Sequence, residues 1–516
     1  MDAWLTKDTS PVILIKWHAQ ASVDCSNRFT ESAFDLPHSS ATGSVLSPAG
    51  VNVEDKMTTT TPNERKTFAV RFTEFGDATT YHGLRYVINN KYSRFRRLVW
   101  LLVVLGMATW LGVNIVKATL LIMQHPESSS ISLNYVPRIV FPAVTICNIN
   151  LLRSNALNES VLETLAEIYD HSVPDYHQKG TGVDFGPVDA LYHYPNGSDS
   201  TETIFSASHQ IEDMLSRCKW RHEKCSPANF TQRLTDHGVC YTFNDPPDER
   251  DVLQVSNPGS SNGLYMRLNI EQDLYTYGES TSAGMKVMLH PQGEFPIVKE
   301  FALSLTPGYE ISIAVRKQMI RTLKAPFKSN CTTSSHLREF PFKYSVSACH
   351  FECMIRFVVD HCGCRDYRWP VKAPICSVEK QVTCVYHYED EFVWDSDACS
   401  CQMSCETLTY ESVMSQSYWP AKHIDRDIRE QFGLPPEFIR ENYMDVYVFM
   451  EEIMYMEIQQ QEAYTLEHFE GDIGGYMGLL CGMSLITLVE WLDFIFLTLC
   501  KRLGCSTRTK SADVKA

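Results

Sequence analysis

GGYMGLLCGMSLITLVEWLDFIF, residues 474–496, is apolar enough to enter a bilayer, yet it contains several glycines and two carboxylates. The charge-free part of this region runs from 473 to 489. A helix needs about 20 apolar residues to cross the hydrocarbon core. A second charge-free stretch, LVWLLVVLGMATWLGVNIV, occupies residues 98–116. We therefore predict two transmembrane helices, near 98–122 and 473–500.

The glycines and carboxylates of the second stretch are unusual in a helix that crosses lipid. A carboxylate at membrane depth costs about 2.5 to 3.5 kcal/mol on insertion scales, so Glu490 and Asp493 are expected to face water or a protein partner. Glycines at Gly474, Gly478 and Gly482 allow close helix contact and can also break the helix. Because two helices cannot enclose a pore, a channel would need several subunits. Helix dimer packing with a snorkelling Asp493 is the alternative interpretation.

Basic residues flank both predicted spans on the outer sides of the sequence, and the positive-inside rule then places both termini in the cytoplasm. The first span begins too far from Met1 for a cleaved signal peptide. This gives five regions: 1–97 cytoplasmic, 98–122 membrane, 123–470 extracellular, 471–500 membrane and 501–516 cytoplasmic. Residues 1–60 are rich in Ser and Thr and are expected to be disordered. Four glycosylation sequons fall in the extracellular region, at Asn158, Asn196, Asn229 and Asn330.

Cysteines point to an oxidising environment for the same region. Fourteen of the 18 cysteines lie between the spans, which predicts seven disulfides. Cys349 and Cys353 are one helical turn apart. Cys399 and Cys401 would share one face of an extended strand. The two spacings match, so a helix and a strand can be cross-linked in a ladder. A zinc site built from the Cys-x-Cys spacings is the alternative.

Charge and periodicity restrict the function classes further. The region between the spans carries roughly twenty net negative charges, which argues against nucleic acid or an anionic membrane surface as its partner. Alternating apolar residues predict strands, and periodicity near 3.6 predicts helices, so we expect a mixed α+β domain. The predicted strands are 141–148, 238–244, 263–270, 285–290, 309–315 and 444–450; the predicted helices are 154–170, 210–217, 347–360 and 422–431. The strands near both spans, at 141 and 444, would connect the sheet to the membrane helices.

Several blocks in a fixed order resemble one family. They are HGLRYV (82–87), FPAVTICNIN (141–150), GVCYTFN (238–244), GDIGGYMGLLCGMS (471–484) and LVEWLDF (488–494). Together they resemble the degenerin, epithelial sodium channel and acid-sensing ion channel family, most closely its acid-sensing branch, over about residues 65 to 503.

The resemblance implies a homotrimer, or a heterotrimer with related subunits, in the plasma membrane. Each subunit would have two transmembrane helices flanking a disulfide-rich extracellular domain shaped like a clenched hand, with palm, ball, finger, thumb and knuckle. Sodium ions, protons and amiloride-type blockers would be its ligands. The implied disulfides are Cys147 with Cys240, Cys218 with Cys225, Cys331 with Cys405, Cys349 with Cys401, Cys353 with Cys399, Cys362 with Cys384, and Cys364 with Cys376.

The resemblance also implies roles for residues near the membrane. His82 and Gly83 match a re-entrant segment that lines the lower pore and affects gating. Gly482, Met483 and Ser484 match the Gly-x-Ser constriction that acts as the selectivity filter. Met483 is larger than the small middle residue that is usual in the family, so the degree of sodium over potassium selectivity is open.

The residues allow more than one stimulus for gating. His125 lies roughly where the family has a sensor histidine, whereas Lys372 stands where acid-sensing relatives commonly have Asp, and Asn257 stands near an expected palm lysine. His468 occupies a position, counted back from Asp472, where family members carry a small residue and where bulky side chains hold these channels open. Histidine changes charge within the physiological pH range, so resting current and inhibition by acid are expected. A solvated His468 without a gating role is the alternative, and peptide gating or constitutive opening are alternative gating modes.

Other classes of protein share the two-span topology. A nucleotide-gated channel would need extracellular Lys and Arg for phosphates, and no obvious basic cluster is visible in the sequence. A two-span receptor fits the topology alone. No Ser-His-Asp or metal-binding signature stands out, so we expect neither an enzyme nor a cofactor or metal site.

Overall fold

The structure is a computed structural model, and it describes residues 68–169, 183–193, 201–333, 336–393 and 399–502. The expected N-terminal tail, the C-terminal tail beyond 502 and the sequon at Asn196 lie outside the described residues. The described residues belong to one compact unit that begins at Thr67.

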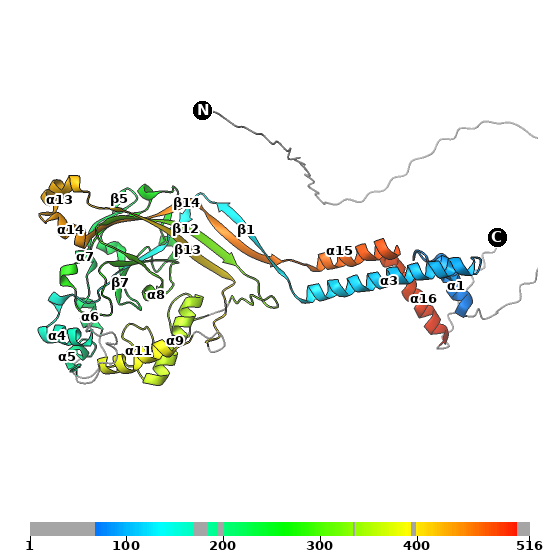
Figure 1. Cartoon of the computed structure of the whole chain (residues 1–516), viewed down its shortest axis with the longest axis horizontal. Helices are drawn as coiled ribbons and strands as arrows, with labels where there is room; N and C mark the ends of the chain where they lie inside the picture. The colour runs from blue at the N-terminus through cyan, green and yellow to red at the C-terminus, as the bar shows by residue number, and fades with distance from the viewer. Residues whose placement is uncertain (1–67, 170–182, 194–200, 334–335, 394–398, 503–516) are drawn as a thin grey trace, which may run out of the picture. The chain divides into compact units, whose positions relative to one another are not determined.

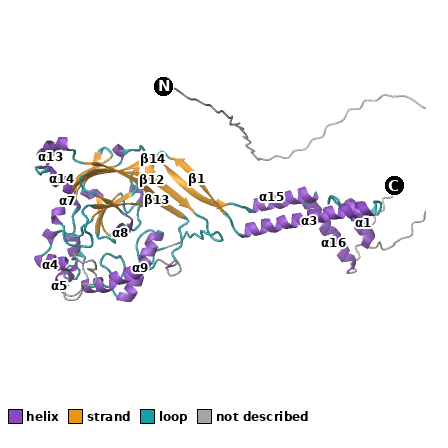
Figure 2. Cartoon of the chain, viewed as in Figure 1, coloured by secondary structure: helices purple, strands orange, loops and turns teal. Residues whose placement is uncertain are grey.

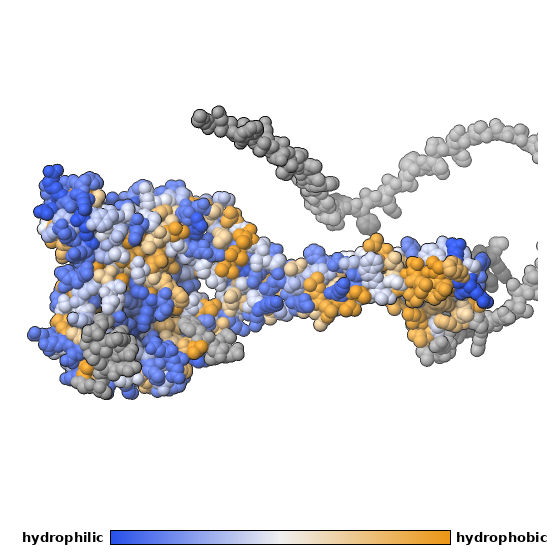
Figure 3. Space-filling view, viewed as in Figure 1, coloured by the Kyte–Doolittle hydropathy of each residue, from blue (hydrophilic) through white to orange (hydrophobic). Residues whose placement is uncertain are grey.

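The helices that border the large domain contain the predicted membrane segments. They are α1 (Phe68–Ala78), α2 (Leu84–Ile88), α3 (Arg94–Met123), α15 (Leu466–Tyr476), the π-helix η9 (Met477–Cys481) and α16 (Leu485–Arg502). Among the described residues, α3 alone is a single helix long and apolar enough to cross a membrane. Figure 3 shows apolar side chains gathered over this end of the chain, and the large apolar side chains of Leu102, Trp110 and Leu485 are exposed there in the single chain.

The second predicted span is not a single straight helix: it is broken within 473–500, as the glycines of this stretch allowed. Residues Leu466–Cys481 and Leu485–Cys500 form two helical parts bent by 75° at a short break, and only as one broken span do they pass the same test of length and composition. Gly482, at the break, has a φ of 63°, a left-handed conformation that residues with a Cβ rarely adopt. The glycine therefore ends the first part, and the chain restarts as α16 three residues later.

The larger sheet is built around a strand that is far longer than its predicted segment. Its path is β13-β12-β14-β9-β4-β5, with β1 paired on β14. The strands are β1 (Glu127–Tyr135), β4 (Leu215–Trp220), β5 (Glu223–Lys224), β9 (Leu264–Asn269), β12 (Tyr309–Arg321), β13 (Glu406–Tyr418) and β14 (Tyr443–Glu462). Every second residue from Met444 to Met450 is buried, as expected for a strand with one face on the core. Figure 2 shows these strands as the central layer of the domain.

Strand β1 was missed, and it replaces the predicted connection through residues 141–148. It pairs with β14 from Glu127 opposite Glu462 to Tyr135 opposite Met454, directly after α3 (Figure 1). In ESSSISLNY only the last five residues alternate apolar and polar side chains, and the apolar ones, Ile131, Leu133 and Tyr135, are exposed in the single chain. The α3 end of the chain is therefore joined to the sheet by β1, and the α15 end by β14.

Residues 141–148 belong instead to a second sheet, whose order is β11-β10-β3-β7-β6. Its strands are β3 (Ala143–Asn148), β6 (Phe230–Leu234), β7 (Val239–Phe243), β10 (Met285–His290) and β11 (Leu303–Leu305). The two sheets share one core, in which Ile146 and Val287 from this sheet join Ile311 and Val446 from the larger one. The predicted strands at 238–244 and 285–290 are confirmed here.

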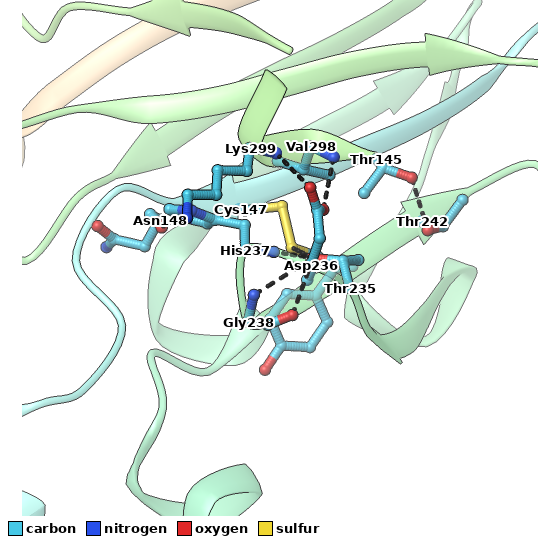
Figure 4. The surroundings of a disulfide bond; sticks show 12 residues. Thr145, Cys147, Asn148, Thr235, Asp236, His237, Gly238, Thr242, Val298 and Lys299 are labelled. Carbon is cyan, nitrogen blue, oxygen red and sulfur yellow. Dashed lines mark hydrogen bonds between the residues drawn. A yellow bond between two sulfur atoms is a disulfide. The ribbon is translucent and has the colours of Figure 1, made fainter. Parts of the chain in front are cut away.

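The Cys147–Cys240 disulfide joins the neighbouring strands β3 and β7 of the second sheet (Figure 4). Beside it, the carboxylate of Asp236 accepts hydrogen bonds from the backbone N–H groups of Val298 (2.7 Å) and Lys299 (3.0 Å). Burial raises the pKa of Asp236 to about 6, against the lowering effect of these two donors.

Helices cover the sheets and form further hydrophobic clusters, around α9, around α4 to α6, and between α13 and α14. The helices are α4 (Glu159–Ile168), α5 (Gly186–Asp189), α6 (Glu202–Ala207), α7 (Ile211–Met214), α8 (Val298–Phe301), α9 (Val346–Cys362), α10 (Val378–Lys380), α11 (Tyr386–Glu391), α13 (Asp425–Phe432) and α14 (Pro436–Asn442). The predicted helices at 347–360 and 422–431 are confirmed. The predicted helix at 210–217 is shorter, because β4 begins at Leu215 and pairs with β9.

The seven disulfides of the structure have the pairing that the family resemblance implies. The ladder is present, with Cα–Cα distances of 5.9 Å for Cys349–Cys401 and 5.7 Å for Cys353–Cys399. The predicted strand at 399–401 is wrong, since Ser400 has a φ of 47° and the segment is not in a sheet. The matching spacing therefore arises from an irregular loop opposite α9.

Candidate pore segment and proton-sensitive groups

The His-Gly segment packs directly against the break in the second span. The backbone N–H of His82 donates a hydrogen bond to the carbonyl oxygen of Cys481 at 3.0 Å. A Cβ added to Gly482 would lie 2.1 Å from Nδ1 of His82. The imidazole therefore rests on the bare backbone of the glycine, and the two sequence motifs form one contact.

Gly83 is equally confined. Its φ is 88°, and a Cβ at this position would lie 2.9 Å from Cγ2 of Val104 on α3. Only a glycine permits both this backbone turn and this close approach to α3. The segment is thus fixed between the first membrane helix and the break.

Threonines on the same segment bind α16. The Thr79 hydroxyl donates to Oε2 of Glu490 at 3.1 Å, and the Thr80 and Thr487 hydroxyls are hydrogen-bonded to each other. The N–H of Ser484 donates to Oγ1 of Thr487 at 3.0 Å, which satisfies one polar group at the start of α16. Glu490 therefore has a partner inside the chain.

Aromatic rings join α1 to the same helix. Phe75 stacks on Phe494 with ring centroids 4.5 Å apart and meets Trp491 edge-on at 4.9 Å. Phe68 and Phe72 approach Phe494 from the preceding turns of α1. These contacts tie α1 and the His-Gly segment to α16 as one body.

The other predicted filter and pore residues have different surroundings. Met483 donates its N–H to the carbonyl oxygen of Met477 at 3.1 Å and is partly exposed in the single chain. Asp493 is exposed, with no ion-pair or hydrogen-bond partner among the described residues. The structure therefore separates the two carboxylates: Glu490 is bound within the chain, whereas Asp493 is available to water or to another subunit.

His468 lies in the first turn of α15. Its N–H donates to Oγ1 of the N-cap residue Thr465 at 3.3 Å, and its exposed ring stacks on Tyr464 with centroids 6.2 Å apart. The Tyr464 hydroxyl donates to Oδ2 of Asp472 at 2.7 Å. His468 and Asp472 are thus linked through one tyrosine at the start of the second span.

The remaining sensor candidates lie elsewhere. His125 follows α3 with a φ of 45°, and its ring meets Phe327 edge-on at 5.6 Å. Lys372 and Asn257 are exposed. Three of the predicted sequons, at Asn158, Asn229 and Asn330, have exposed asparagines.

Glu294, which sequence reasoning missed, is a partly buried carboxylate at the contact between two loops. It lies between β10 and α8, and its backbone forms an isolated β-bridge with Lys343 of the loop that precedes α9. The N–H of Lys343 donates to the carbonyl oxygen of Gly293 at 2.8 Å. Burial raises the pKa of Glu294 to about 7, and Lys343 opposes that rise. The local sequence GEFP, a single carboxylate before an apolar residue and a proline, is the only signal that could have indicated burial.

Tyr410 on β13 is the second titratable neighbour of Glu294. Its buried hydroxyl has no hydrogen-bond partner among the described residues. Burial, followed by the negative charge of Glu294, raises the pKa of Tyr410. A charged Glu294 therefore has the Lys343 ammonium and the Tyr410 phenol nearby, and burial removes most of the water that would otherwise solvate it.

Glu279 is a contrasting carboxylate. Burial alone would raise its pKa, but the Arg368 guanidinium at 3.1 Å and the Lys299 ammonium at 3.7 Å lower it to about 2. Arg368 also binds Asp366 at 2.7 Å. Glu279 therefore stays ionised through mild acidification, whereas Glu294 changes charge in that range.

Comparison with known proteins places these features in one family. The family model for amiloride-sensitive sodium channels matches residues 75–494. Acid-sensing ion channel 1 of Gallus gallus is 30% identical over 84% of this chain and 86% of its own length. Acid-sensing ion channel 1A of Danio rerio is 30% identical over 84% of this chain and 89% of its own length. Acid-sensing ion channel 2 of Homo sapiens is 29% identical over 82% of this chain and 85% of its own length. A solved proton-activated chloride channel superposes with a TM-score of only 0.30 at 6% identity, over 78% of this chain and 96% of that one.

Proposed function

Since this chain belongs to the amiloride-sensitive sodium channel family, in its acid-sensing branch, we propose that it forms a trimeric, sodium-selective channel of the plasma membrane that is blocked by amiloride and modulated by extracellular protons. It is an ion channel subunit and not an enzyme. The observation that carries the proposal is the break at Gly482–Ser484 with His82 packed on it. A broken helix exposes backbone carbonyls that can replace the hydration shell of an ion, which a continuous helix cannot do.

The filter in this proposal consists of the backbone around Gly482, Met483 and the Ser484 side chain, repeated three times around the pore axis. Met483 is flexible enough to pack behind such a ring. The His-Gly segment supports the filter from the cytoplasmic side, because it contacts both Cys481 and Gly482. Currents from cells that express this chain alone, with sodium replaced by potassium and amiloride added, test the proposal: absence of any amiloride-sensitive cation current from surface-expressed protein would refute a homomeric channel.

Proton modulation is supported by Glu294, whose buried carboxylate changes charge near neutral pH. His468 supports a second effect, because three exposed imidazoles at the outer end of the pore would repel entering sodium ions once protonated. A constitutively open channel that acid inhibits is therefore the second candidate, and the bulky His468 favours it over peptide gating.

Neutralising the carboxylates of α16 is expected to reduce cation conduction. In the double variant Glu490→Gln/Asp493→Asn, conductance or the sodium over potassium permeability ratio should fall severalfold, because rings of carboxylates concentrate cations. Asp493→Asn alone should account for most of the loss, since Glu490 is already bound to Thr79. Single-channel recording with a surface-expression control measures both quantities. Unchanged conductance and selectivity would show that neither carboxylate faces the ion path.

Removing the histidine at the outer end is expected to lower the resting current. His468→Gly should reduce the current at neutral pH severalfold and weaken its inhibition by acid, because both the bulk and the added charge of the ring are lost. His423→Gly, an exposed histidine near α13, provides the matched control. Whole-cell currents recorded while the external pH is stepped decide the question. Equal resting currents and pH curves in all three proteins would remove His468 from the gate.

A further inference from the structure

A pocket of about 270 Å³ opens where α9 faces the loop Cys399–Gln402 and the loop that precedes α9. The two disulfides of the ladder, Cys349–Cys401 and Cys353–Cys399, fix one wall to α9. The Tyr344 hydroxyl donates to the carbonyl oxygen of Gln402 at 2.5 Å and fixes a second wall. Covalent bonds and short hydrogen bonds therefore hold the pocket in one shape.

The one carboxylate that lines this pocket is already hydrogen-bonded within the protein. Glu352 on α9 is 3% exposed, and its oxygens accept hydrogen bonds from the backbone N–H groups of Arg338 (3.0 Å), Glu339 and Phe340 (3.2 Å). Three N–H donors stabilise its negative charge inside the protein, and the charge itself remains. The same bonds hold the backbone of Arg338 against α9, one turn from Arg356.

Two arginines and a histidine of the same pocket have no acidic partner, in the part of the chain that the structure describes, that would balance their charge. Arg338, Arg356 and His336 line the pocket, and none of them has an ion-pair partner among the described residues. Arg356 is half-buried and Arg338 is exposed. Glu339 and Asp360, which are close in sequence to Arg338 and Arg356, do not line the pocket, so its lining has two arginines against the one carboxylate of Glu352. The site is a local excess of positive charge in a region that carries roughly twenty net negative charges.

From this arrangement we propose that the pocket binds an oxyanion of the sulfate type, either free sulfate or a sulfate group on a polysaccharide. Guanidinium groups present planar pairs of N–H donors that match the oxygens of such an anion, and they remain charged at every physiological pH. Arg338 and Arg356 supply the paired donors, and His336, which also lines the pocket, supplies a ring nitrogen. A small polar pocket with fixed walls restricts the ligand to a compact anion.

Sulfate binding to the full-length protein in detergent micelles tests this inference. Equilibrium dialysis with radiolabelled sulfate, at constant ionic strength in chloride, gives the affinity directly. Wild type is expected to bind saturably, and Arg338→Gln/Arg356→Gln is expected to bind at least about tenfold more weakly. Arg426→Gln/Arg429→Gln, which removes the same charge from exposed positions on α13, should bind like wild type. No saturable binding to wild type, or equal binding by the two double variants, would overturn the proposal.

A second double variant, which keeps both positive charges, separates weaker binding from misfolding. Arg338→Lys/Arg356→Lys keeps both charges but loses the paired donors, so it should bind more weakly than wild type, and unchanged binding would overturn recognition by the two guanidinium groups. Competition by a sulfated oligosaccharide separates the sources of the anion. Displacement at much lower concentration than inorganic sulfate would assign the group to a polysaccharide, and equal potency per sulfate would assign it to the free ion. Because the readout is binding, failure here leaves the channel proposal untouched.

Discussion

Gly482→Ala is expected to abolish the current of this channel. The added Cβ would lie 2.1 Å from Nδ1 and 2.4 Å from Cγ of His82, far inside any van der Waals contact. The backbone of His82 is held by its N–H bond to the carbonyl oxygen of Cys481, so relief of the clash would need the imidazole to leave its position on Gly482. The φ of 63° at Gly482 adds a backbone penalty of about 1 kcal/mol for a residue with a Cβ. The break and its support by the His-Gly segment should both be disrupted.

The measurement needs a control for glycine substitution within the same region. Gly474→Ala, one element earlier, meets nothing within 4 Å in the single chain. It should retain current at comparable surface expression. Whole-cell recording and surface biotinylation of both variants separate loss of conduction from loss of the protein. If Gly482→Ala conducts like Gly474→Ala, the contact between His82 and the break does not support the pore.

The break that His82 contacts is one of the features that could be predicted from the sequence. The glycines and carboxylates of residues 474–496 indicated a helix that does not simply cross lipid, and the structure breaks that helix at one of those glycines. The helix side of the ladder was predictable because the spacing of Cys349 and Cys353 depends on local helix geometry, whereas the strand predicted at 399–401 is an irregular loop. In both cases the information lies within a few residues of sequence.

Features that depend on distant partners were missed. Strand β1 alternates apolar and polar residues only from Ile131 to Tyr135, and its pairing with β14 extends it back to Glu127. The bound state of Glu490 depends on Thr79, which is 411 residues away in sequence. Glu294 acquires its unusual environment from loops and strands that come later in the chain. A sequence pattern reports periodicity within an element, whereas burial of a single carboxylate is set by contacts between elements.

Glu294→Gln is expected to remove the main pH-dependent change of the large domain near neutral pH. Because the folded-state pKa of about 7 lies above the ordinary value of 4.5, the folded domain binds this proton more tightly than the unfolded chain. The stabilisation from protonation is complete below pH 4.5 and is lost as the pH rises through 7. The gap between these two pKa values corresponds to at most about 3 kcal/mol, which partial solvent access reduces. Glutamine mimics the protonated form at every pH.

Thermal unfolding of wild type and Glu294→Gln at high and at low pH tests this expectation. At about pH 8 the variant should unfold at a higher temperature than wild type, and the difference should shrink as the pH falls and vanish below about pH 4, where Glu294 is protonated in both the folded and the unfolded chain. Glu300→Gln, which removes the same charge from an exposed position on α8, should not change the pH dependence. The midpoint of the current's response to external pH should shift only in the Glu294 variant, because neutralising this carboxylate removes its attraction to the Lys343 ammonium across the contact between the two loops. Identical pH curves for wild type and both variants would mean that the proton response of the channel originates at other groups, with His468 at the outer end of the pore as the remaining candidate.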